Sequence, residues 1–241
     1  MTVEGIIEED YAPQMIRHSF KLSSSTQGPL MTFLDMRNSL AGLTVADRLI
    51  RLRLWGDHGF LDDVMLVQDV EGVESIWGGI EYHLLCVSPT AGMTLKQFIA
   101  MPAELQFVTS SGTLRRVCGI VDCVQEGESD GGLGTYRLTM RDALSINDKG
   151  CNTRIFRDMN EVDITNVVLG DWCRDNPVLA RAFQFQTWRL KSDYPRREFT
   201  FQRRESDSAF LRRLWKRRGF SWFFSPAVEA ADGDAPVHVL M

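Results

Sequence analysis

The chain has 241 residues, of which 44% are hydrophobic and 24% are charged, and its formal net charge is −5 at pH 7. This composition is ordinary for a globular protein that buries a core. Its five cysteines form no C-x-x-C pair, which argues against a disulfide framework and for folding in a reducing cytoplasm. The acidic first ten residues predict no signal peptide, and no apolar run reaches the roughly 20 residues needed to cross a bilayer.

The first part of the chain predicts a leader followed by short strands. Residues 1–30 lack clear periodicity and are expected to form a mobile leader, and residues 31–43 are expected to hold a short helix. Alternation of apolar and polar residues between turn signals predicts strands at 49–55, 64–70, 79–87, 104–109, 114–125 and 135–141. A short helix is predicted at 95–100, ahead of Pro102. This succession favours an antiparallel β-barrel over residues 31–148.

After Asp142 the pattern changes to mixed helix and strand. A strand is predicted at 151–156, and Asn160 with Asp163 can form a capping box that starts a helix. The buried stripe of that helix is predicted to be Ile164, Val167, Val168 and Trp172. Strands at 182–190 and 199–203 and a helix at 207–218 complete an α+β subdomain over residues 149–228. Residues 229–241 are expected to start a second barrel that is truncated.

The most informative segment runs from residue 194 to residue 224 and predicts strand, capped helix and aromatic strand. Phe199 and Phe201 alternate with polar residues, which is the period of a half-buried strand. Ser206 or Asp207 can cap the helix, and Gly219 supplies a left-handed end. Four apolar residues at helical spacing predict its buried stripe: Phe210, Leu211, Leu214 and Trp215.

This segment resembles the VgrG family, the tip or spike proteins of bacterial type VI secretion systems. The resemblance covers roughly residues 40 to 225. An upstream hairpin motif at Asp130, Gly131 and Gly132 agrees with it in order and spacing. The motif residues of the segment itself are Tyr194, Pro195, Arg197, Glu198, Gln202, Glu205, Ser206, Asp207 and Gly219.

The resemblance implies a structural hub of the phage tail type. Three copies would form a homotrimer that caps an Hcp-like tube, carries a puncturing needle and meets needle-tip or effector proteins. Trimer formation is expected to be weakened in a chain that holds one complete barrel. The protein would assemble in the cytoplasm and then be secreted or injected into a target cell. A baseplate hub of a prophage tail or tailocin is the alternative within the same architecture.

The sequence predicts no catalytic residues, no cofactor and no metal site. The four histidines are scattered, and nucleotide-binding and nucleophile motifs are absent. Glu198, Glu205 and Asp207 lie near arginines and could mimic an acid–base group, but carboxylates at a helix start are better explained by the helix dipole. A cell-wall hydrolase is a further alternative, since some tip proteins carry enzymatic extensions.

Charge is unevenly placed along the chain. Between Arg189 and Arg218, eleven basic residues against four acidic residues give +7, so the remainder carries −12. This band, together with Trp215 and Trp222, suggests a nucleic-acid-binding module as an alternative of another class. A solvated helix face or charge complementarity between subunits explains the band better, and nucleic acid is therefore an unlikely partner.

Overall fold

The computed structural model describes residues 48–57, 59–61, 64–109, 113–129, 133–188, 190, 193–227 and 235–241, together with the backbone of residues 5–6 and 15–21. The helix expected at 31–43 and the hairpin residues Asp130, Gly131 and Gly132 lie outside these ranges. Within the expected leader, the backbone forms two strands, β1 (Gly5–Ile6) and β2 (Met15–Lys21).

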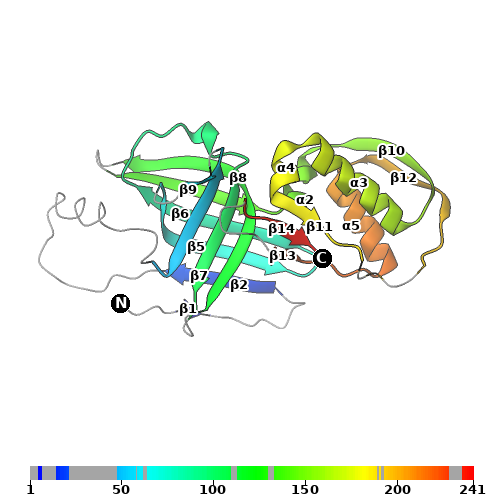
Figure 1. Cartoon of the computed structure of the whole chain (residues 1–241), viewed down its shortest axis with the longest axis horizontal. Coiled ribbons are helices and arrows are strands. Elements are labelled where there is room, and N and C mark those ends of the chain that lie inside the picture. The colour runs from blue at the N-terminus through cyan, green and yellow to red at the C-terminus, as the bar shows by residue number, and fades with distance from the viewer. Residues whose placement is uncertain are drawn as a thin grey trace, which may run out of the picture.

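A nine-stranded antiparallel sheet makes up the first part of the fold (Figure 1). Its strand order is β1-β2-β5-β6-β9-β8-β7-β3-β4. The seven strands that follow β2 are β3 (Ile50–Gly56), β4 (Gly59–Leu61), β5 (Leu66–Ser75), β6 (Gly79–Ser88), β7 (Pro102–Val108), β8 (Leu114–Ser129) and β9 (Gly134–Arg141). The predicted strands are thus confirmed with shifted ends. No pairing among the described strands joins β4 to β1, so the sheet is antiparallel but not shown to be a closed barrel.

The core of this sheet follows from side-chain alternation along its strands. In β3, Ile50, Leu52 and Leu54 are buried at every second position. Tyr82 of β6 is fully buried, and its ring lies over Gly72 of β5, where a Cβ atom would approach the ring to 2.1 Å. Glycine is therefore required at position 72 by close packing.

The second part combines helices with two small sheets (Figure 1). A two-stranded antiparallel ribbon pairs β10 (Asn152–Met159) with β12 (Arg197–Glu205). The three-stranded sheet has β14 (His238–Leu240) between parallel β11 (Phe183–Phe185) and antiparallel β13 (Phe224–Pro226). The helical elements are α2 (Ala143–Ile146), α3 (Glu161–Asp175), α4 (Pro177–Ala182) and α5 (Asp207–Arg218), with 3-10 turns η2 (Leu95–Gln97) and η3 (Asn147–Lys149).

The two long helices begin and end where local signals place them. The side-chain oxygen of Asn160 accepts from the backbone N–H groups of Val162 and Asp163, at 2.9 Å each, and completes the predicted capping box. Ser206 caps α5 by accepting from the Ala209 N–H at 3.0 Å. Gly219 ends α5 with a φ of 79°, the left-handed conformation that glycine adopts without a Cβ penalty.

Several sequence-based expectations are wrong in detail. Val167 is exposed, although the other three residues of the predicted α3 stripe are buried. Phe199 and Phe201 alternate as predicted, but they face solvent, whereas Thr200 and Gln202 face the helices. The reason is that the Gln202 side chain lies beneath the ribbon, where it forms hydrogen bonds described below. The strand predicted at 182–190 is the end of α4 followed by the short β11, and 95–100 holds only the turn η2.

Hydrogen bonds join the large sheet to the second part. The Trp77 N–H, at the tip of the β5–β6 hairpin, donates to the Trp222 carbonyl at 2.9 Å, and Nη2 of Arg116 in β8 donates to the Ala227 carbonyl at 3.0 Å. Within the second part, the Ala143 N–H of α2 donates to Nε2 of the buried His238 in β14 at 3.0 Å. Among the helices of the described residues, none is long and apolar enough to cross a membrane.

Candidate functional site

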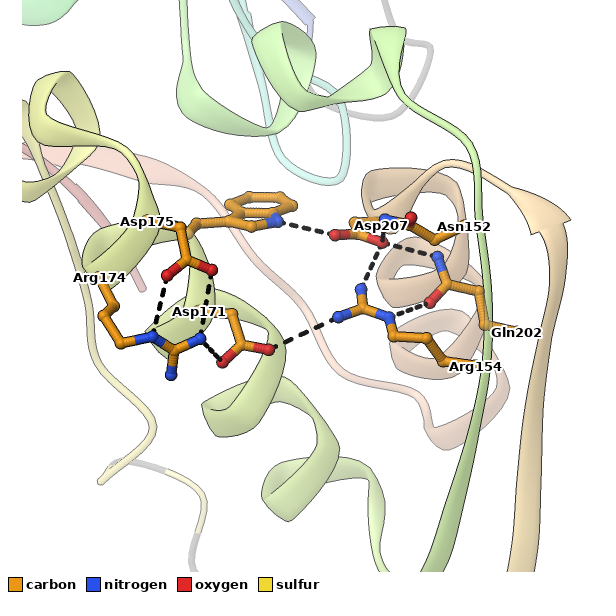
Figure 2. A network of polar contacts seen from close by, with 8 residues as sticks. Asn152, Arg154, Asp171, Arg174, Asp175, Gln202 and Asp207 are labelled. Atoms are coloured by element: carbon orange, nitrogen blue, oxygen red, sulfur yellow. Dashed lines mark hydrogen bonds and ion pairs between the residues drawn. The ribbon is translucent and has the colours of Figure 1, made fainter.

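The carboxylate of Asp207, the first residue of α5, is the centre of a polar network under the β10–β12 ribbon (Figure 2). Its Oδ1 accepts from Asn152 Nδ2 at 2.9 Å, Arg154 Nη2 at 2.5 Å and Gln202 Nε2 at 2.7 Å. Its Oδ2 accepts from the indole Nε1 of Trp172 at 2.9 Å. Asp207 therefore joins both strands of the ribbon, α3 and α5 through one side chain. We call these five residues the Asp207 network.

Electrostatics hold the Asp207 carboxylate in its charged form. Burial raises the pKa of Asp207, but hydrogen bonds from Gln202, Asn152, Trp172 and Arg154 outweigh burial and bring the pKa below its usual value. Arg154 also donates through Nε to Oε1 of Gln202 at 3.0 Å, which orients the Gln202 amide. All of these donors point to an anchoring role, since they occupy the carboxylate oxygens that a general base would need free.

The network continues to the surface through α3 (Figure 2). Nη1 of Arg154 lies 3.6 Å from Oδ2 of Asp171. Asp171 also pairs with Arg174 at 2.7 Å, and Arg174 donates through Nε to Asp175 at 2.9 Å. These outer ion pairs are solvent-exposed at Arg174 and Asp175, so we expect them to contribute little to stability.

A second buried carboxylate, Glu161 at the start of α3, binds two arginines. Its Oε1 accepts from Arg197 Nη2 at 2.5 Å, and its Oε2 accepts from Arg218 Nε at 3.0 Å and Nη2 at 2.7 Å. The Glu161 residue is 1% exposed, so its carboxylate is shielded from water, whereas the side chains of Arg197 and Arg218 are 26% and 23% exposed. The guanidinium of Arg218 also lies 5.3 Å from the Tyr194 ring centroid, and that ring packs on Phe220 at 5.1 Å. Glu161 therefore links α3, β12 and the end of α5.

The predicted motif residues separate into framework residues and exposed residues. Gln202 and Asp207 belong to the Asp207 network, Arg197 and Tyr194 belong to the surroundings of Glu161, and Ser206 and Gly219 cap α5. Glu205 accepts from Arg213 Nη2 at 2.5 Å near the surface. Pro195 and Glu198 are exposed.

Sequence reasoning misses two partners of Asp207 and the second carboxylate itself. The sequence pattern assigns no role to Asn152, places Trp172 only in the apolar stripe and does not single out Glu161. The one local signal was the position of Glu161, directly after the N-cap Asn160, where an acidic residue favours the helix dipole.

Several arginines of the basic band are neutralised within the chain. Arg197 and Arg218 bind Glu161, Arg212 pairs with Asp148 at 3.3 Å, and Arg213 pairs with Glu205. Trp215 and Trp222 are buried, so their rings are not available to stack on bases. The hypothesis that these two tryptophans stack on bases in a nucleic-acid interface is therefore wrong. Within the described ranges, no three histidine, cysteine or acidic side chains gather closely enough to hold a metal ion.

Comparison with known protein families shows which family this chain matches. The family model described as phage tail baseplate hub (GPD) matches residues 73–240, which include both carboxylate centres. The chain belongs to this family. The match covers the large sheet from the end of β5 through β9 and all of the α+β part, so the buried framework described above lies within the matched region.

Curated relatives confirm the resemblance to VgrG proteins. The type VI secretion system spike protein VgrG4b of Pseudomonas aeruginosa is 32% identical over 164 residues, which are 68% of this chain and 19% of that protein. The actin cross-linking toxin VgrG1 of Vibrio cholerae is 29% identical over 176 residues, covering 69% of this chain and 15% of that protein. The chain thus spans less than a quarter of the length of these hub-family relatives.

One solved structure shares the fold of this hub-family chain. The E. coli c3393 protein is described as a component of the type VI secretion system with structural similarity to the T4 bacteriophage tail proteins gp27 and gp5. It superposes with a TM-score of 0.61 at 17% identity, over 79% of this chain and 48% of that chain.

Proposed function

We propose that this chain is the structural hub component at the tip of a contractile injection machine of the type VI secretion class. In this role it forms a homotrimer that caps an Hcp-like tube and carries the puncturing needle. The observation that carries the proposal is the hub-family match over residues 73–240. The buried carboxylates support it, because their oxygens are committed to cross-linking α3, α5 and the ribbon and so favour rigidity over turnover.

Strands β3 to β9 of the large sheet are proposed to act as the first hub barrel. Arg48, just before β3, donates through Nη1 to the Val67 carbonyl of β5 at 2.9 Å. These strands are far apart in the sheet order, so the bond supports a sheet that curls back on itself. Rolling the sheet in this way would cover edge groups that otherwise invite unwanted pairing.

The proposed division of the chain has a leader at 1–30, the barrel at 31–148, the α+β subdomain at 149–228 and the start of a second barrel at 229–241. A trimer can meet six equivalent positions of a hexameric tube only if each chain supplies two similar surfaces. Assembly in the cytoplasm, followed by secretion or injection, belongs to the same proposal.

The motif residues are proposed to be structural. By their contacts, Gln202, Asp207 and Arg197 hold helices to the ribbon, and Ser206 and Gly219 fix the ends of α5. Substitution of these residues is expected to lower the free energy of unfolding, and to weaken binding to partners only through that loss of stability.

The test is co-sedimentation of this chain with rings of an Hcp-like tube protein. We expect the chain to move with the rings and to form a trimer at micromolar or higher concentration. A chain that stays monomeric and leaves the rings in a separate fraction would contradict the proposal.

A baseplate hub of a prophage tail or tailocin is the second candidate, and it is favoured because the matched family is described as a phage tail baseplate hub. Neighbouring genes separate the two. Sheath and Hcp-like genes without capsid genes support the secretion role, and capsid or tail-fibre genes support the phage role.

A further inference from the structure

The outer face of the β10–β12 ribbon is a small apolar surface with an arginine at each end. The strand register places Thr153 opposite Arg203, Ile155 opposite Phe201 and Arg157 opposite Phe199. All six side chains share the face that points away from the helices, because alternate residues of a strand point to the same side. Ile155, Phe199 and Phe201 form the centre of this surface, which we call the ribbon face.

The apolar residues of the ribbon face are unusually accessible. Ile155 is 52% exposed, Phe199 is 53% exposed and Phe201 is 49% exposed. The two phenylalanine rings meet edge to face at 5.3 Å. Cross-strand contact of this kind stabilises a ribbon, yet it leaves about half of each ring in water. Aromatic side chains clustered on one exposed face are typical of the centre of a protein interface.

The arginines of the ribbon face differ from the other arginines of the basic band. Arg157 and Arg203 are exposed and form no hydrogen bond or ion pair among the described residues, whereas Arg197, Arg213 and Arg218 bind carboxylates within the chain. Their positions lie four residues apart along the strands, or about 13 Å at 3.3 Å per residue. The surface thus presents two unneutralised cations on either side of an apolar centre.

We propose that the ribbon face binds an acidic polypeptide segment of another protein in extended conformation. In such a segment alternate side chains point to one face, so carboxylates four residues apart match the spacing of Arg157 and Arg203. An apolar side chain midway between them would contact Phe201 and Ile155. The predicted occupant has the pattern acidic, any, apolar, any, acidic. This inference does not rest on the hub function proposed above.

Charge and shape favour a polypeptide over a nucleic acid on this face. A nucleic-acid surface would need a continuous run of cations along a phosphate chain, but here the centre is apolar and the cations stand only at its ends.

The test uses the 241-residue chain and a fluorescein-labelled peptide of sequence Gly-Ser-Glu-Thr-Ile-Thr-Glu-Ser-Gly. Fluorescence anisotropy is compared with that of two matched peptides, one with serine in place of isoleucine and one with lysine in place of both glutamates. We expect both matched peptides to bind at least about ten-fold more weakly, because each removes one half of the recognition.

Variants of the chain test the location of binding. Arg157→Glu combined with Arg203→Glu is expected to weaken binding of the first peptide by about ten-fold or more. Lys216→Glu combined with Arg217→Glu makes the same change of charge on exposed residues of α5 and is expected to leave affinity within about two-fold. Circular dichroism of both variants checks that the fold is retained.

Four results would overturn the proposal. Two concern the peptides: the first peptide fails to bind, or the lysine peptide binds with the same affinity as the first. The other two are an equal loss of affinity in the two double variants, and DNA binding that is tighter than peptide binding and is lost with the Arg157 and Arg203 changes. Self-association of the chain that disappears in Phe199→Ser with Phe201→Ser would instead assign the face to a second copy, which also contradicts it. The tube co-sedimentation is read separately, so failure of one proposal leaves the other standing.

Discussion

The indole Nε1–H of Trp172 donates to Oδ2 of Asp207 at 2.9 Å and so fastens the side of α3 to the first turn of α5. Both residues are less than a tenth exposed. A charge-assisted hydrogen bond in such surroundings fixes geometry as well as adding stability. Together with the Glu161–Arg218 ion pair, this carboxylate therefore fixes the relative position of the two helices.

Replacement of that carboxylate is expected to destabilise the chain strongly. Asp207→Asn leaves one acceptor oxygen for four donors and removes the nearest counter-charge of Arg154, which should lower the free energy of unfolding by about 3 kcal/mol. Urea denaturation at pH 7 measures the change. Glu205→Gln is the control, since Glu205 pairs with the exposed Arg213 and should cost at most about 1 kcal/mol. Equal losses in the two variants would contradict the assignment of Asp207 as an anchor.

The contribution of Asp207 should also depend on pH. Its pKa is lower in the folded chain than the value near 3.9 of an unfolded aspartate, so the unfolded chain takes up the proton first on acidification. Stability from this group is present above about pH 4 and is lost as the pH falls through the folded pKa. The difference in unfolding free energy between wild type and Asp207→Asn should therefore shrink between pH 6 and pH 3. A difference that is constant over this range would show that charge is not the cause.

Glu161 is expected to be energetically coupled to its two arginines. Glu161→Gln should lower the free energy of unfolding by about 3 kcal/mol, because it removes the buried counter-charge of two partly buried guanidinium groups. Arg218→Met should cost clearly less in the Glu161→Gln background than in wild type. A double-mutant cycle by urea denaturation should yield a coupling of about 1 to 3 kcal/mol. Additive effects of the two changes would mean that the contact contributes nothing.

How much of this framework the sequence could predict depends on how local its signals are. Helix α5 was predicted with its correct bounds because Ser206 and Gly219 act within a few residues of the helix ends. The partners of Asp207 could not be predicted in this way, because Trp172, Arg154 and Asn152 lie 35 to 55 residues away in the sequence. Alternation in β12 gave the strand but not its orientation, since a period of two is the same whichever face is buried.

Gly79 is expected to tolerate no side chain. Its φ is +125°, and a Cβ atom would stand 2.3 Å from Oδ2 of Asp142, which accepts from the Ile80 N–H at 2.8 Å. Gly79→Ala should therefore destabilise the chain by about 2 kcal/mol or more in thermal or urea unfolding. Gly150→Ala is the control, because open space surrounds that residue and its φ is −92°. Indistinguishable stabilities of the two variants would remove the argument from close approach.

His238 should make the chain sensitive to mild acid. Burial lowers the pKa of His238 to about 3, whereas an unfolded histidine titrates near 6.5. The unfolded chain therefore binds the proton first, so stability falls as the pH drops from 6.5 toward 3. At pH 5 the loss should be about 2 kcal/mol relative to pH 7.

Two histidine variants check the source of this acid sensitivity in urea denaturation at pH 7 and pH 5. His238→Gln should lower stability at pH 7, since the Ala143 N–H loses a well-placed acceptor, but it should remove most of the difference between the two pH values. His83→Gln changes a side chain that is more than half exposed and should preserve the difference. Retention of the full pH effect in His238→Gln would assign it to other groups.

The central position of β14 has a mechanical consequence. Because β14 pairs on one side with parallel β11 and on the other with antiparallel β13, a pull on Met241 along the strand axis loads two sets of hydrogen bonds at once. The bonds lie across the direction of pull, so they must break together rather than one after another. Force entering at this point would spread through α4 and the β13 connection into the body of the molecule, and the strand would resist extraction better than one at a sheet edge.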